Sequence, residues 1–309
     1  MSLHVPFITP FAGWAKAKFS LLAGKQPFCT IVGGPVSGKK ILFSKEMTMG
    51  DLTGRSDIKV LKALQKLVLH QVALKKDAVI LNAGAGYGLY ELFFAKHLGS
   101  QCQLYSFESG SGAQELLEKN LGANNVQNAT LIKKAISGKI GIINFFENPL
   151  HGSSLVEEEA RNHHKTTVNK TVFTTTLDIF CKRYILSPSF IRLNVNGSAD
   201  QALLGAAETI EKSRPVIFVH PKRKEERAAI AQLMELQHYE AFSINEFEWA
   251  HLDNDNEEAT EEALQGPLLL CPYQLKEEVN YAMYNRYRRD AGAVRKWMPR
   301  NTSGDYALN

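Results

Sequence analysis

The chain has 309 residues, of which 44% are hydrophobic and 22% are charged. This is the composition of an ordinary globular protein, and it excludes an intrinsically disordered one. The formal net charge of +4 is too small for this length to indicate nucleic acid or an anionic membrane as a partner. Four widely separated cysteines without a Cys-x-x-Cys pair predict reduced thiols rather than a zinc site, so no metal is expected.

The N-terminus does not read as a secretion signal, because Lys16 and Lys18 interrupt its apolar stretch. No segment approaches the roughly 18 apolar residues that a membrane span needs. We therefore expect a cytoplasmic protein.

Residues 1–76 form a region of mixed character. Phe28–Val32 and Ile41–Phe43 predict two strands joined by the glycine-rich turn Gly33–Lys40. That turn is one residue away from a phosphate-binding P-loop, but Lys40 replaces the required Ser or Thr and a strand follows instead of a helix. The turn therefore predicts a hairpin. Apolar residues at helical spacing predict an amphipathic helix over Ile58–Val72.

Strands and helices alternate over the middle of the chain. The predicted strands are Ala78–Ala83, Cys102–Phe107, Ala129–Ile136, Ile140–Phe146, Thr171–Thr175, Phe190–Val195, Pro215–Val219, Glu240–Ile244 and Leu268–Leu270. The predicted helices are Leu89–His97, Gln114–Leu121, Asp200–Lys212 and Glu225–Leu236. This alternation predicts an α/β fold with a mostly parallel sheet and helices on both faces. We expect a hairpin-and-helix region at 1–76 that packs on a core domain at 77–275, and a basic extension at 276–309.

A glycine loop follows the first strand of the core domain. Gly84, Gly86 and Gly88 stand between that strand and an amphipathic helix, where glycines allow a tight turn and the helix N-terminus offers free N–H groups. Glu108 ends the next strand, in position to accept the hydroxyls of an adenosine ribose. A dinucleotide-binding loop needs Gly or Ala where this chain has Leu89. The pattern therefore favours S-adenosylmethionine over a dinucleotide, and a dinucleotide oxidoreductase is the weaker alternative.

From about Lys62 to Tyr239 the chain resembles the FkbM family of S-adenosylmethionine-dependent methyltransferases. The resemblance rests on residues 82–88, Glu108-Ser109, Asn120, residues 135–137, 152–155 and 176–178, and on the run Arg192–Ala199 with Leu203–Ala206 after it. It implies a Rossmann-like class I methyltransferase fold with a seven-stranded type of sheet. It also implies O-methylation of a sugar-like or secondary-metabolite hydroxyl, on a small-molecule or glycan acceptor.

The resemblance assigns residues to the site. Cofactor contacts are expected at Asn82, Gly84, Gly86, Tyr87, Gly88, Glu108, Ala135, Ile136 and Asn194, and substrate contacts at Ser153, Ser154 and Asn196. Candidate bases are His220, His151 and Asp178. His220 is favoured because ligands of open α/β folds collect at the carboxyl edge of the sheet.

Four acids of the family pattern are replaced by neutral residues. Asn82, Asn194, Asn196 and Ala199 stand in their places, and an asparagine keeps an acceptor oxygen but cannot serve as a base. Two interpretations stay open: an enzyme adapted to a different, more anionic substrate, or a catalytically silent binding or scaffold protein.

The C-terminal stretch Tyr281–Asn309 carries several arginines and tyrosines. It suits a terminal helix that packs its aromatics, a homodimer contact or, less well, a nucleic-acid contact.

Overall fold

The computed structural model describes residues 26–44, 47–148, 152–154, 168–250 and 257–284, together with Ala15 and Lys18. Its strands are β1 (Phe28–Thr30), β2 (Lys40–Leu42), β3 (Val79–Ala83), β4 (Gln103–Phe107), β5 (Ala129–Ile132), β6 (Ala135–Ile136), β7 (Gly141–Asn148), β8 (Gly152–Ser154), β9 (Val168–Thr175), β10 (Phe190–Leu193), β11 (Val216–Val219), β12 (Tyr239–Ser243), β13 (Glu248–Trp249) and β14 (Leu268–Pro272). Its α-helices are α2 (Met49–Thr53), α3 (Ile58–Leu69), α4 (Leu89–His97), α5 (Ser111–Ala123), α7 (Leu177–Tyr184), α8 (Ala199–Leu204), α9 (Ala207–Ser213), α10 (Lys224–Gln237), α11 (Glu257–Ala263) and α12 (Lys276–Tyr284).

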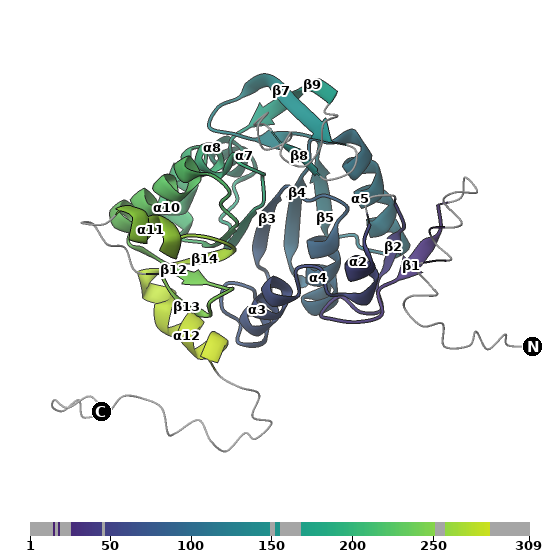
Figure 1. Ribbon diagram of the computed structural model, residues 1–309, viewed down its shortest axis with the longest axis horizontal. Coiled ribbons are helices and arrows are strands. Elements are labelled where there is room, and N and C mark those ends of the chain that lie inside the picture. Colours follow the sequence, from purple (N-terminus) through teal and green to yellow (C-terminus); the bar gives the residue numbers. More distant parts are fainter. Residues whose placement is uncertain are drawn as a thin grey trace, which may run out of the picture.

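A twisted central sheet organises the molecule (Figure 1). Among the described residues its strands follow the order β13-β12-β14-β11-β10-β3-β4-β5. The run from β11 to β5 is parallel, and β14 enters antiparallel between β11 and β12. The strand order reverses between β3 and β10, which is where open α/β sheets bind ligands at their carboxyl ends. The predicted Rossmann-like, mostly parallel fold is confirmed.

Helices cover both faces because the central strands are apolar on both faces. Every residue of β10 and β11 is buried, as expected for parallel strands that have no solvated side. One face packs against α3, α4 and α12, and the other against α7, α8, α10 and α11. Successive strand residues alternate between these two clusters, as the pleat requires.

A small second sheet has the order β6-β9-β7-β8 and stands at the top of Figure 1, far from α3 and α12. It lies in the chain between β5 and α7. The predicted strand Ala129–Ile136 is thus wrong as one element. β5 pairs with β4 in the central sheet, whereas β6 pairs with β9 in the small one. The exposed lysines at 133 and 134 occupy the turn between them.

The predicted helix Asp200–Lys212 is also two elements, α8 and α9. Gly205 ends α8, and its carbonyl accepts the N–H of Asp178 at 2.9 Å instead of continuing the helical ladder. A Cβ at Gly205 would lie 2.2 Å from the carbonyl oxygen of Ser137. The close approach of a neighbouring strand therefore requires glycine here, and glycine is a poor helix former.

The N-terminal hairpin is confirmed, since β1 and β2 pair antiparallel and no helix follows the Gly33–Lys40 turn. The hairpin packs against α5, where the side chains of Asn120 and Asn124 accept backbone N–H groups of β2. Side chains of α3 and α12 share one apolar cluster with the central strands. The segments on either side of the boundaries at 76 and 275 therefore contribute to a common core. The division into domains at these boundaries stays a prediction.

The structure describes the C-terminal stretch only as far as Tyr284, so its arginine-rich part lies outside the described residues. In the described part of the chain, no helix is both long enough and apolar enough to span a bilayer.

Asn120 is expected to carry much of the attachment between hairpin and core. Its Oδ1 accepts the N–H of Leu42 at 2.6 Å and its Nδ2 donates to the carbonyl of Tyr87 at 2.7 Å. Replacing it by alanine leaves both backbone groups without a partner and should lower the free energy of unfolding by about 2–3 kcal/mol, measured by urea denaturation. Asn124→Ala is the matched control, because Asn124 binds Lys40 in exposed surroundings, and it should cost less than about 1 kcal/mol. Equal losses in the two variants would contradict the assignment.

Candidate cofactor site and adjoining cavity

The glycine loop turns between the end of β3 and the start of α4. Its three glycines have left-handed backbone, with φ of 79° at Gly84, 58° at Gly86 and 93° at Gly88. A Cβ at Gly84 would lie 2.0 Å from the carbonyl oxygen of Asn194, so glycine is what lets the ends of β3 and β10 come together. A Cβ at Gly86 would meet nothing within 4 Å. The middle of the loop therefore leaves room for a ligand at the N-terminus of α4.

Glu108 follows β4 and holds this loop through its carboxylate. Oε2 accepts the N–H of Gly86 and Oε1 accepts the N–H of Gly110, each at 2.8 Å. Burial raises the pKa of the Glu108 carboxyl, while these backbone hydrogen bonds oppose the rise. Each carboxylate oxygen has a second lone pair, so both can still accept a hydroxyl from a ligand.

Tyr87 ties the loop to the N-terminal region. Its hydroxyl donates to Oδ1 of Asp51 at 2.9 Å, and Asp51 is itself fixed by the N–H and hydroxyl of Thr48 at the start of α2. Burial, followed by the charge of Asp51, raises the pKa of Tyr87 well above its usual value, so the hydroxyl stays a donor. Because the Tyr87 hydroxyl is hydrogen-bonded to Asp51 of α2, a cofactor contact at Tyr87 would be made by its backbone.

A chain of buried polar groups lies beneath the loop. Asn82 has no exposed surface; its Nδ2 donates to Oε1 of Glu91 at 2.6 Å, and its Oδ1 accepts from Nη1 of Arg192 at 2.9 Å. Ser106 also donates to Oε1 of Glu91, at 2.7 Å. Nη1 of Arg192 donates in addition to the carbonyl of Gly84 at 3.1 Å. Both ends of the Asn82 amide are thus used inside the protein.

A cavity of about 410 Å³ opens at the carboxyl ends of β10 and β11. It is lined by residues 57–60 at the start of α3, by the rings of Tyr90 and Phe218, and by Arg192, Asn194 and His220, among others. Because Asn194 also contacts Gly84, the cavity adjoins the glycine loop. The structure therefore brings three sequence-predicted residues together here: Gly84, Asn194 and His220.

Two groups in the cavity can accept a hydrogen bond. Burial, with a further contribution from Lys222, lowers the pKa of His220 to about 4, and Nζ of Lys222 lies 3.4 Å from its Nε2. His220 is therefore a neutral imidazole near neutral pH. Asp57 supplies a carboxylate whose Oδ2 accepts the hydroxyl of Tyr90 at 3.0 Å.

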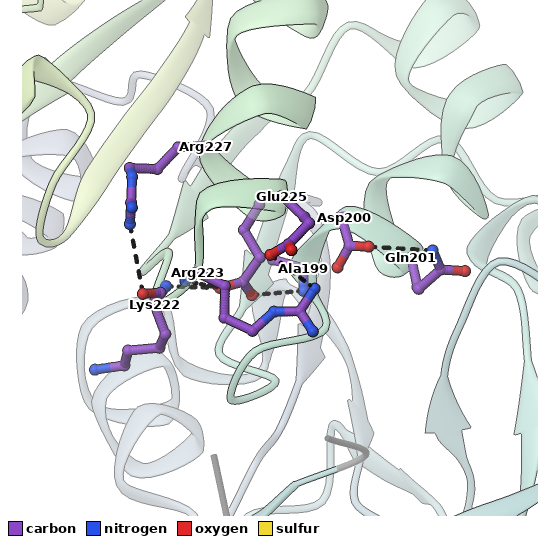
Figure 2. Close-up of polar contacts among 8 residues, drawn as sticks. Ala199, Asp200, Gln201, Lys222, Arg223, Glu225 and Arg227 are labelled. Carbon is purple, nitrogen blue, oxygen red and sulfur yellow. Dashed lines mark hydrogen bonds and ion pairs between the residues drawn. The ribbon is translucent and has the colours of Figure 1, made fainter. Parts of the chain in front are cut away.

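A carboxylate from another helix, that of Glu226, lies beside the neutral residue Ala199. Glu226 of α10 is 1% exposed; its Oε1 accepts the N–H of Ala199 at 2.7 Å, and its Oε2 accepts the N–H groups of Lys222 and Arg223. Figure 2 shows the start of α8 at Ala199 beside the turn at Lys222 and Arg223. Glu226 thus joins the turn after β11, which carries His220, to the turn after β10, which carries Asn194 and Asn196.

The other predicted site residues lie elsewhere in the fold. Ala135 and Ile136 form β6, and the backbone of Ser153 and Ser154 belongs to β8 of the small sheet. Asn196 lies in the turn after β10, with φ of 37°. Asp178 accepts the N–H groups of Thr209 at 2.7 Å and Glu208 at 3.2 Å, so it caps α9 rather than its own helix and is not among the cavity-lining residues.

His151 lies outside the described residues. Among those described, no group of three or more His, Cys, Asp or Glu side chains is placed to hold a metal ion.

Sequence reasoning missed four residues of this region: Asp57, Glu91, Arg192 and Glu226. Arg192 and Glu91 had a signal, since each interrupts an otherwise apolar buried segment, and buried charges are rare unless they are paired. Asp57 and Glu226 had none, because each reaches the site only through the packing of a helix distant in the chain.

Restoring a carboxylate at position 82 tests the buried chain. Asn82→Asp replaces the donor that faces Glu91 with an acceptor, so two carboxylates share one buried site with Arg192 as the only neighbouring cation. The pair must hold a proton, which raises a folded-state pKa above the unfolded value. Stability is then present at low pH and lost as the pH rises.

We expect Asn82→Asp to lower the free energy of unfolding by about 2 kcal/mol at about pH 8 and by much less at about pH 5, measured by urea denaturation. Asn125→Asp adds the same charge at an exposed position and should change little at either pH. A loss that does not depend on pH would contradict this account of the pair.

The protonation of His220 can be measured directly. We expect its ring proton resonances to titrate with a midpoint near pH 4, as the lowered pKa of about 4 requires. Lys222→Ala removes a neighbouring positive charge and should raise the midpoint. A wild-type midpoint near the usual value of about 6.5 would show that this imidazole is solvated.

No curated protein matches the chain in sequence. Solved structures that are similar to it include the methyltransferase FkbM from Methylobacillus flagellatus KT, at 12% identity and a TM-score of 0.38, over 63% of this chain and 43% of that one. The chain thus spans less than half the length of that protein.

Two further similar structures are precorrin-6y C5,15-methyltransferase from Geobacter metallireducens GS-15, at 9% identity and a TM-score of 0.40 over 74% and 89% of the two chains, and Aeropyrum pernix fibrillarin with natively bound S-adenosyl-L-methionine, at 11% identity and a TM-score of 0.38 over 69% and 74%. Similarity at this level carries no information about the ligand of the present chain.

The sequence profile of the methyltransferase FkbM domain matches residues 82–301. This range is more than half of the chain and begins at Asn82 beneath the glycine loop. The chain therefore belongs to the FkbM methyltransferase domain family.

Proposed function

We propose that the protein is an S-adenosylmethionine-dependent methyltransferase that methylates a hydroxyl of an acceptor held in the cavity. The observation that carries the proposal is the hydrogen bond that the Gly86 N–H donates to Glu108 Oε2, at the carboxyl edge of the sheet next to the point where the strand order reverses. This places a buried acid and an open glycine loop together, as a nucleoside cofactor requires.

The residues present fit that cofactor. Gly86 leaves open space where a side chain would block the loop, and Glu108 has lone pairs for two ribose hydroxyls. Gly84, Gly88 and the backbone of Tyr87 complete the loop, and Asn194 stands where the loop meets the cavity. When bound, the cofactor supplies an electrophilic methyl group on a positively charged sulfur.

The chain itself aligns the acceptor and receives its proton. The rings of Tyr90 and Phe218 give the cavity apolar walls, which exclude water and fix the acceptor, and such positioning is a large part of catalysis in a displacement reaction. His220 is neutral and can accept a hydrogen bond from the acceptor hydroxyl. Because its pKa is about 4, it is a weak base and takes the proton only as the hydroxyl becomes acidic in the transition state.

The acceptor class rests on the family. A sugar-like or secondary-metabolite hydroxyl is what the FkbM resemblance implies, and no lining residue identifies it further. The cavity walls come partly from residues 57–60, which lie before the matched range, so the acceptor can differ from that of other members.

A second candidate is a catalytically silent binding protein with the same fold. It is favoured by the neutral residues Asn82, Asn194, Asn196 and Ala199. Glu91 and Glu226 weaken this alternative, because each brings a carboxylate next to one of those positions.

The cofactor site is tested by calorimetric titration with S-adenosylmethionine and S-adenosylhomocysteine. We expect saturable binding of both to the wild type. Glu108→Ala should weaken binding by about ten-fold or more, since it removes charge-assisted hydrogen bonds to the ribose.

Glu108→Gln should lose less, because an amide oxygen remains to accept one bond. Glu115→Ala, on the exposed side of α5, is the matched control and should bind as the wild type does. If neither ligand binds to the wild type, the methyltransferase proposal is wrong. Transfer of a radioactive methyl group into a pool of hydroxylated metabolites would distinguish an active enzyme from a catalytically silent protein.

A further inference from the structure

Arg192 is a buried cation on a central strand. It is 3% exposed, and it lies on β10 between strands that are apolar on both faces. Within the part of the chain that the structure describes, no carboxylate forms an ion pair with it. Charged side chains are almost never fully buried unless they are paired, so the position of Arg192 calls for an explanation.

The hydrogen bonds of the guanidinium leave one of its nitrogens unmatched. Nη1 donates to Asn82 Oδ1 and to the carbonyl of Gly84, which uses both of its protons. Nε is buried and has no hydrogen-bond partner. The edge that contains Nε and Nη2 is the edge by which an arginine forms two parallel hydrogen bonds with a carboxylate. The protein thus fixes one edge of the group and leaves Nε on the other unmatched.

The surroundings hold the guanidinium in place as a cation. Its Cζ lies 3.6 Å from the centre of the Tyr90 ring and 5.8 Å from that of Phe218, distances at which a cation is attracted to an aromatic face. Tyr90 is fixed in turn by its hydrogen bond to Asp57. All four of these side chains line the cavity, so the cation is presented to whatever occupies it.

Two positions near Arg192 where the family has acidic residues carry neutral asparagines in this chain. Asn82 contacts the guanidinium directly, and Asn194 lies two residues after Arg192, just past the end of β10. Glu91 is reached only through the Asn82 amide. An aspartate at position 82 would neutralise the guanidinium from within the protein, whereas asparagine leaves its charge available to a ligand.

We propose that Arg192 binds a carboxylate group of a ligand in this cavity. The proposal deepens the proposed function, because the carboxylate has two sources there: the amino-acid end of the cofactor, or the acceptor. A planar, singly charged carboxylate matches a single guanidinium edge. A phosphate group carries more negative charge and would face the carboxylate of Asp57, which lines the same cavity.

The first arm of the test compares two ligands that differ by the carboxylate alone. These are S-adenosylhomocysteine and its decarboxylated analogue, which keeps the adenosine, the sulfur and the amine. If the cofactor supplies the carboxylate, the wild type binds S-adenosylhomocysteine at least ten-fold more tightly. Arg192→Gln abolishes this preference, and saturable binding of the analogue shows that the variant is folded.

Arg192→Lys keeps the charge but not the paired donors, and it should retain only part of the preference. Lys62→Gln removes a positive charge from an exposed position of α3 and should not change it.

The second arm tests the acceptor as the source. Acetate is titrated into protein loaded with S-adenosylhomocysteine while the 15N resonance of Arg192 Nε is followed, with chloride at equal ionic strength as the control. A saturable shift with acetate but not chloride, in a protein that binds both adenosyl ligands equally, assigns the carboxylate to the acceptor. Equal binding of the two ligands with no shift from acetate overturns the proposal. Failure of the wild type to bind either adenosyl ligand overturns the proposed function instead, and the acetate titration of the unloaded protein still decides the role of Arg192.

Discussion

The site depends on one buried polar chain that runs from Glu91 through Asn82 to Arg192 and the carbonyl of Gly84. It joins α4, β3, β10 and the glycine loop at the place where the strand order reverses. Buried polar groups are costly unless their partners are placed well, so this chain restricts the relative positions of the elements it connects. The glycines allow the left-handed turns of the loop, and this fixed base sets where the loop lies.

A second constraint comes from the N-terminal region, outside the range that matches the family. Asp51 holds the Tyr87 hydroxyl, and Asn120 joins the Tyr87 carbonyl to β2. The start of α3 forms one wall of the cavity. The matched domain therefore provides the glycine loop, whereas the preceding segment both braces that loop and shapes the space beside it. Residues 57–60 line the cavity, while the brace to the loop comes from Asp51, so the two roles belong to different parts of the segment.

Much of the fold was predictable because its signals are local. The apolar run Ala78–Ala83, the three glycines and the helix Leu89–His97 each follow from spacing within a few residues, and the structure confirms them. The division of Ala129–Ile136 between two sheets was not predictable in this way, since β6 is defined by pairing with β9. The break at Gly205 likewise depends on the carbonyl of Ser137, which follows β6 and lies 68 positions away in the chain.

The same distinction explains what could be predicted of the site. Glu108 was found because its position relative to the loop is fixed by one strand and one turn. The cavity was not, because α3, α4 and two central strands meet there only in the folded chain. His220 was placed correctly at the strand edge, but its weak basicity comes from burial and from Lys222, which the spacing of residues does not reveal.

The contacts around the neutral residues of the motif show how the site is held without acids at those positions. Carboxylates from two helices lie beside positions 82 and 199, namely Glu91 of α4 and Glu226 of α10. Glu226 accepts three backbone N–H groups, so it organises the two turns that frame the cavity, and Glu91 fixes Asn82. The guanidinium of Arg192 has no direct carboxylate partner among the described residues, because the Asn82 amide stands between it and Glu91. The turns that frame the cavity are therefore held by a buried carboxylate, whereas the cation that lines the cavity is not balanced directly by the described part of the protein.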